Sequence, residues 1–129
     1  MSRLLPALVS LLALVACDSS GTAGDVALGT EFTLAPGRSA TAGDDGLRVR
    51  FEGVAEDSRC PKDAICIWSG QVIVDVTTGR DGARHSLKPD ETATVDGYRL
   101  KLVRVEPYPS SEAPIEPSQY RATFVVLPT

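Results

Sequence analysis

The chain has 129 residues with 13 basic and 17 acidic side chains, a formal net charge of −4. This length suits a single domain that can bury a core. The acidic balance and the absence of a basic patch argue against a nucleic-acid partner. The aromatic content of 5% also argues against a stacking surface for single strands.

The N-terminus has the order of a secretory signal peptide. Arg3 precedes a stretch from Leu4 to Ala16 that is almost entirely apolar and ends in small residues. A membrane-spanning helix needs about 20 residues, so this stretch is too short to cross a bilayer. A buried core helix is the alternative, but its polar face would consist of Ser10 alone. We predict that residues 1–16 are a signal peptide.

The end of this stretch, Leu14-Val15-Ala16-Cys17, resembles the lipobox of bacterial lipoproteins. The resemblance implies that the chain is cut before Cys17 and that lipid and acyl chains such as palmitate are attached to this residue. The membrane is then a partner, and the protein belongs to the bacterial cell envelope, facing the periplasm or the exterior. An ordinary signal peptidase site, with Cys17 left as a free thiol, is the alternative.

The cysteine count agrees with a lipid on Cys17. The chain has three cysteines, and an odd number in an exported protein leaves one thiol unexplained. If Cys17 carries lipid, Cys60 and Cys66 are left to pair. The small, polar residues that follow Cys17 predict a flexible tether, so that 17–29 is the lipidated cysteine with its tether and 30–129 is the domain.

From residue 30 the pattern is one of short strands and turns. Short strands are expected at 30–34 and 38–42, on either side of a Pro36-Gly37 turn. The next segment, 47–52, alternates apolar and charged residues, which predicts a strand lying on a core. Its apolar face consists of Leu47, Val49 and Phe51.

The second half continues in the same way. Strands are expected at 71–78, 83–87, 91–95, 98–106 and 119–127, with a four-proline loop at 107–118. The alternation slips at Leu102-Val103, which predicts a bulge. One face of the last strand carries Tyr120, Ala122, Phe124 and Val126. No segment has a sustained helical period, so seven or eight short strands predict an all-β fold, a small β-sandwich or open barrel.

The segment 56–70, EDSRCPKDAICIWSG, is the most unusual. It resembles a group of small exported or lipid-anchored bacterial proteins of unassigned function, which carry a D-S-R-C-P segment, a second cysteine, a tryptophan and a glycine. The resemblance covers most of residues 30–80 and implies a family but no activity. The matching residues are Asp57, Ser58, Arg59, Cys60, Pro61, Cys66, Trp68 and Gly70.

In an oxidising compartment Cys60 and Cys66 are expected to form a disulfide. Closing this short loop is worth roughly 2.4 kcal/mol in the chain-entropy account. The loop then has two interpretations. In the first it is a staple, in which Asp57 and Arg59 cap or pair locally and Trp68 packs against the bridge. In the second it is a preformed recognition loop that displays Arg59, Lys62 and Asp63 and has little entropy left to lose on binding. The candidate recognition residues are then Asp57, Arg59, Lys62, Asp63 and Trp68. A redox role is disfavoured, because the spacing is not C-x-x-C.

No metal, cofactor or catalytic constellation is expected. His85 is the only histidine and is predicted to be a surface side chain, while Asp44-Asp45 is predicted to form a turn rather than a calcium site. No G-x-S-x-G elbow is present.

The expected function is therefore a non-enzymatic, membrane-anchored binding or envelope-structural module, with an envelope protein as a candidate partner. One alternative is an inhibitor of an envelope protease that inserts the loops 57–68 and 107–118. A second alternative is a small hydrolase, which would need two convergent carboxylates or a serine beside His85.

Overall fold

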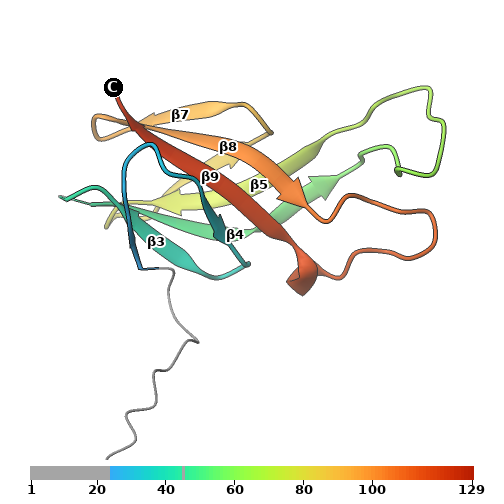
Figure 1. Cartoon of the computed structure of the whole chain (residues 1–129), viewed down its shortest axis with the longest axis horizontal. Coiled ribbons are helices and arrows are strands. Elements are labelled where there is room, and N and C mark those ends of the chain that lie inside the picture. The colour runs from blue at the N-terminus through green and yellow to red at the C-terminus, as the bar shows by residue number, and fades with distance from the viewer. Residues whose placement is uncertain (1–23, 45) are drawn as a thin grey trace, which may run out of the picture.

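The computed structural model describes residues 24–44 and 46–129 (Figure 1). The predicted signal peptide, Cys17 and residues 18–23 of the predicted tether lie outside this part of the chain. Within it, no helix is long and apolar enough to span a bilayer.

The fold is all-β, as the sequence predicts. One sheet has five strands in the order β1-β3-β4-β5-β6, and the other has four in the order β2-β9-β8-β7. The single helical element described is a short 3-10 turn, η1. The elements are β1 (Asp25–Val26), β2 (Phe32–Leu34), β3 (Ser39–Ala42), β4 (Leu47–Asp57), β5 (Val72–Thr78), β6 (Ala83–Leu87), β7 (Thr92–Val95), β8 (Tyr98–Glu106), η1 (Pro117–Gln119) and β9 (Arg121–Pro128).

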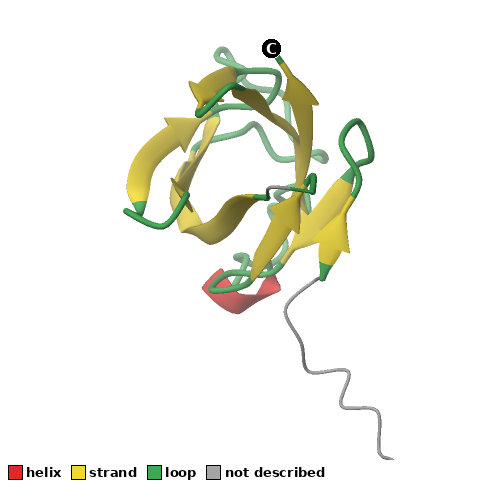
Figure 2. Cartoon of the chain, turned by 90° about the vertical axis from the view of Figure 1, so that its left-hand side faces the viewer, coloured by secondary structure: helices red, strands yellow, loops and turns green. Residues whose placement is uncertain are grey.

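The core lies between the two sheets. Residues at every second position of β5, of β9 and of the first part of β4, from Leu47 to Phe51, point into it, as the alternation predicts. Phe51 of β4 and Phe124 of β9 are both 0% exposed and meet edge to face across the interface, with ring centroids 6.2 Å apart. Seen along the long axis, the two sheets curve around this core (Figure 2).

The N-terminal strand β1 and the bulges agree only in part with what the sequence predicts. Residues 24–29 were expected to belong to the tether, but β1 lies there and pairs in parallel with β3. Val26 packs against the core, and the Gly29 amide donates to the carbonyl of Val126. A strand of two residues shows no alternation, so the sequence contains no sign of β1. The bulge at Leu102-Val103 is confirmed by a register shift on β8, while two further shifts on β4 were not predicted.

The two longest connections project together from one end of the molecule. These are the β4–β5 loop, residues 58–71, and the β8–β9 connection beyond residue 106, which extend to the right in Figure 1. The described chain begins toward the other end of the long axis (Figure 1). The sandwich therefore separates the start of the described chain, at Gly24, from these loops.

Candidate functional site

The β4–β5 loop leaves the sheet through a narrow neck. The Ser58 amide donates to the carbonyl of Gln71 at 2.7 Å, and the Cys60 amide donates to the carbonyl of Ser69 at 3.1 Å. Gly70 has a φ of +67°, and a Cβ there would overlap the carbonyl oxygen of Ser58. Glycine is required at this position by both conformation and space.

The Cys60–Cys66 disulfide is confirmed. It closes the loop above the neck, with a Cα–Cα distance of 5.9 Å. Within the closed ring the Ala64 amide donates to the carbonyl of Pro61 at 3.0 Å. The loop is thus held by a covalent bond and by main-chain hydrogen bonds.

Asp57 and Arg59 form a buried ion pair at the base of the loop. Arg59 donates from Nε to Oδ1 and from Nη2 to Oδ2 of Asp57, both at 2.8 Å. The side chains are 8% and 9% exposed for Arg59 and Asp57, respectively. This local pairing is the one expected of a staple. The expectation that Arg59 is displayed for recognition is wrong, because its guanidinium is buried and hydrogen-bonded to Asp57.

Arg59 also binds the second connection. Its Nη1 donates to the carbonyl of Val105 at 2.9 Å, and its Nη2 donates to the carbonyl of Pro107 at 3.0 Å. The guanidinium carbon lies 4.8 Å from the centroid of the Tyr108 ring, within the range of a cation–π contact. One side chain thereby joins the end of β4 to the chain that leaves β8.

Tyr120 completes this network with a 2.8 Å hydrogen bond from its hydroxyl to Oδ2 of Asp57. Burial alone would raise the pKa of Asp57, but the hydrogen bonds from Arg59 and Tyr120 outweigh it and lower that pKa below its ordinary value. Burial, together with the bond to the Asp57 carboxylate, raises the pKa of Tyr120 to about 12. At neutral pH the network therefore contains a charged Asp57 carboxylate and a neutral Tyr120 hydroxyl.

A second set of contacts joins the loops further out. The Lys62 amide donates to the carbonyl of Pro109 at 3.0 Å, and the Ser111 amide donates to Oδ1 of Asp63 at 2.9 Å. The Ser111 hydroxyl also donates to Asp63, and these bonds lower the pKa of that carboxyl. The segments 58–71 and 107–116 thus form one unit, which we call the two-loop end. Asp63, although exposed, joins the two loops of this unit.

The outermost side chains of this end are apolar. Ile65 is 104% exposed, Ile67 96% and Trp68 82%. We call these three residues the apolar tip. The expectation that Trp68 packs against the disulfide is wrong, since this side chain lies mostly in solvent. Tyr108 of the second loop, on the same two-loop end, is 51% exposed.

The candidate site lies in the segment that the sequence singled out, and Trp68, one of the residues selected there, belongs to the apolar tip. Sequence reasoning also selected Arg59, Lys62 and Asp63 for their charge. Arg59 is buried in the ion pair with Asp57, whereas Lys62 and Asp63 are exposed and Asp63 accepts hydrogen bonds from Ser111. Sequence reasoning did not select Ile65 and Ile67. The apolar run on both sides of Cys66, in a loop between two strands, was the signal that identifies them.

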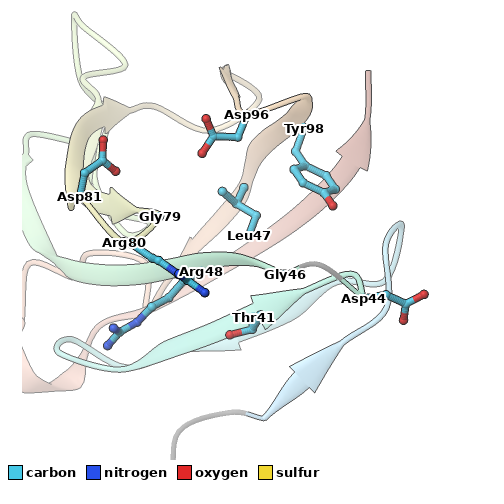
Figure 3. A pocket seen from close by; sticks show the side chains of 10 residues that line it. All are labelled: Thr41, Asp44, Gly46, Leu47, Arg48, Gly79, Arg80, Asp81, Asp96 and Tyr98. Atoms are coloured by element: carbon cyan, nitrogen blue, oxygen red, sulfur yellow. The ribbon is translucent and has the colours of Figure 1, made fainter.

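A broad polar hollow lies at the other end of the sandwich (Figure 3). It has a volume of about 1100 Å³ and is formed by the β3–β4, β5–β6 and β7–β8 turns. Figure 3 shows Asp81, Asp96 and Tyr98 on one side of β4 and the side chain of Arg48 on the other, while Asp44 points away from them. In the part of the chain that is described, no group of three metal-ligating side chains is brought together.

His85 is half-buried on β6. Its Nε2 lies 3.0 Å from the hydroxyl of Thr78, a side chain that is 1% exposed. This places the histidine in a local structural contact, and the neighbour is a threonine rather than the serine that the hydrolase hypothesis needs.

Comparison with protein-family models, with curated proteins and with solved structures found no match for this chain.

Proposed function

We propose that this protein is a membrane-anchored, non-enzymatic binding module of the bacterial cell envelope, and that the apolar tip is its contact surface. One observation carries the proposal. Three large apolar side chains, Ile65, Ile67 and Trp68, are almost fully exposed on a loop whose base is rigid.

Such exposure has a cost in water, which favours a role in contact. Single exposed apolar residues are ordinary on protein surfaces, but apolar groups gathered on one projecting feature mark interaction sites. The disulfide and the ion pair between Asp57 and Arg59 order the loop before any contact is made. Little conformational entropy is then lost on binding.

The membrane anchor is supported by the cysteines. Because Cys60 and Cys66 pair with each other, Cys17 is the remaining one of the three. Its position after the apolar stretch and within Leu14-Val15-Ala16-Cys17 favours lipid attachment over a free thiol. We place the domain on an envelope membrane through this residue.

Inhibition of an envelope protease is a second candidate. It is favoured by the contacts from Lys62 to Pro109 and from Asp63 to Ser111, which hold the loops 57–68 and 107–118 side by side as a wedge. A panel of serine, cysteine, aspartic and metalloproteases tests this candidate. Inhibition that is lost in Ile67→Asp would favour it, and no inhibition of any class at micromolar protein would remove it.

The proposal is tested by photo-cross-linking in bacterial cells. A photoreactive residue at Ile67 of the full chain is expected to give discrete adducts with protein or phospholipid. The same residue at Arg84, an exposed position on β6, is the matched control and is expected to give few. Equal labelling at the two positions would contradict the contact surface.

The anchor has its own test in the same cells. Cys17→Ser is expected to move the protein from the membrane fraction to the soluble fraction. Retention of this variant on the membrane would contradict lipid attachment at Cys17, whatever the cross-linking shows.

A further inference from the structure

We infer that the partner of the apolar tip is the surface of a lipid bilayer, into which Ile65, Ile67 and Trp68 insert. This inference rests on the proposed function, since it names the partner of the same surface. It follows from the shape, the chemistry and the charge of the two-loop end.

The shape of the tip is convex. Exposed fractions of 104%, 96% and 82% mean that the side chains of Ile65, Ile67 and Trp68 have almost no neighbours on this chain. A protein partner must supply a pocket that fits such projections, whereas the acyl region of a bilayer is deformable and accepts any apolar shape. A rigid projecting tip therefore suits a lipid surface.

The chemistry of the tip is that of an interfacial anchor. Tryptophan is enriched at the boundary between headgroups and acyl chains, and aliphatic side chains add affinity by burying apolar area below it. Below the tip, the amides of Cys60, Lys62 and Ala64 already donate to main-chain carbonyls, so this part of the loop can lose water at little cost.

The charges of the β4–β5 loop do not oppose insertion. Asp57 and Arg59 neutralise each other in the buried base. Asp63 is turned toward Ser111 of the second loop, and the exposed Lys62 leaves a cation that can meet lipid phosphate. Lys62 and Asp63 cancel in net charge, and the second loop adds the exposed acids Glu112 and Glu116. Contact is therefore expected to depend on apolar burial and not on anionic lipid.

The position of the tip complements the proposed lipid on Cys17. The described chain begins toward the opposite end of the long axis from the loops (Figure 1). The segment 17–24 can span at most about 25 Å, and β4 alone, with 11 residues, is about 36 Å long. A domain held at both ends would lie along the bilayer, and its tether would keep a weak tip contact at high effective concentration.

The test uses residues 24–129, which contain all the described strands and the described core. A cooperative urea transition first checks that this part folds on its own. Trp68 is the only tryptophan of the chain and reports directly on the tip. The probes are vesicles of phosphatidylcholine, and of phosphatidylethanolamine with phosphatidylglycerol, at millimolar lipid. We expect a blue shift of Trp68 emission with both, and quenching by lipids that carry bromine on their acyl chains.

The matched variants locate the contact. Ile65→Ser combined with Ile67→Ser is expected to lower partitioning by roughly tenfold, because two aliphatic side chains are removed from the buried surface. Leu28→Ser changes another exposed aliphatic residue, 37% exposed and beside Gly43 at the hollow end, and is expected to leave partitioning unchanged.

Several results would overturn the inference. These are no shift with either vesicle, an equal shift in the double variant, or a dimer in solution that the double variant abolishes. If Ile67 instead cross-links only to a protein in cells and Trp68 does not respond to vesicles, the binding module stands and the lipid partner is wrong. If the domain inserts but Cys17→Ser leaves the full chain on the membrane, the lipid partner stands and the anchor is wrong.

Discussion

Tyr120 donates a 2.8 Å hydrogen bond from its hydroxyl to Oδ2 of Asp57, and this bond links residues 63 positions apart at the foot of the two-loop end. Tyr120 immediately precedes β9 of one sheet, and Asp57 ends β4 of the other. Arg59 then connects the same carboxylate to the carbonyls of Val105 and Pro107. A single buried carboxylate therefore joins the base of the β4–β5 loop to the chain on both sides of the second loop.

Tyr120→Phe tests the link between the sheets. The variant keeps the ring, which is 9% exposed, and removes only the hydroxyl that donates to Asp57. A hydrogen bond to a charged group is worth about 1.5–3 kcal/mol, so we expect a loss of that size in the free energy of unfolding, measured with urea. Tyr108→Phe is the control, because that ring is 51% exposed, and it should change little. Equal effects in the two variants would refute the role of the bond.

The same carboxylate predicts how stability depends on pH. The pKa of Asp57 is lowered in the folded protein from an ordinary value of 3.8. A lowered pKa adds stability that is present above pH 3.8 and is lost as the pH falls through the folded value. Unfolding free energies measured between pH 6 and pH 2 should therefore fall less steeply in Asp57→Asn than in the native protein.

Asp63→Asn is the companion variant for this experiment. The Asp63 carboxyl also has a lowered pKa, through hydrogen bonds from Ser111, but it lies at the solvent-exposed outer part of the two-loop end. Water screens its interactions, so its removal should flatten the pH profile less than removal of Asp57. The opposite order would mean that the buried ion pair does not control acid stability.

The fold was predictable because the pattern of each long strand is simple. Leu47, Val49 and Phe51 alternate with charged residues, and period-two burial leaves one solution for such a segment. β1 was not predictable, because a strand of two residues shows no alternation and is recognised only by its pairing with β3. The bulges on β4 also escaped prediction, since they arise from the way β4 and β5 pair.

The sequence singles out the segment that holds the candidate site, but it does not predict which of its side chains are exposed. The disulfide follows from cysteine count and compartment, but the sequence does not state which side chains a closed loop turns inward. Arg59 is internal because the carbonyls of Val105 and Pro107, almost 50 residues away, lie within its reach. Trp68 is external because no such partner lies above the neck of the loop. Long-range contacts of this kind determine which side chains stay exposed for recognition. The local sequence shows no pattern that reveals them.

Gly70→Ala tests the neck of the β4–β5 loop. Gly70 and Gly82 share a φ of +67°, but a Cβ at Gly70 would overlap Ser58, whereas one at Gly82 would have no neighbour within 4 Å. Both variants carry the conformational cost of about 1–2 kcal/mol for a left-handed residue. Only Gly70→Ala must also move the backbone, so it should lose clearly more stability than Gly82→Ala in urea unfolding. Similar losses would show that the neck is not tight.

A thiol count on the purified full-length product separates the roles of all three cysteines. The Cys60–Cys66 bond leaves neither of these sulfurs free, and lipid on Cys17 would block the third. In denaturant without reductant we therefore expect no reactive thiol in protein from the membrane fraction. One thiol would confirm the disulfide and contradict the lipid, and two or more would contradict the disulfide.

The contribution of the disulfide to stability is measured with the double variant Cys60→Ser and Cys66→Ser. Loss of the cross-link is expected to lower the free energy of unfolding by roughly 2.4 kcal/mol, because the unfolded chain regains the entropy of an open loop. The buried ion pair of Asp57 and Arg59 lies below the bridge and should survive, so the pH dependence of stability should keep its shape. A changed pH profile in this variant would mean that the bridge, rather than Arg59, holds the base of the loop.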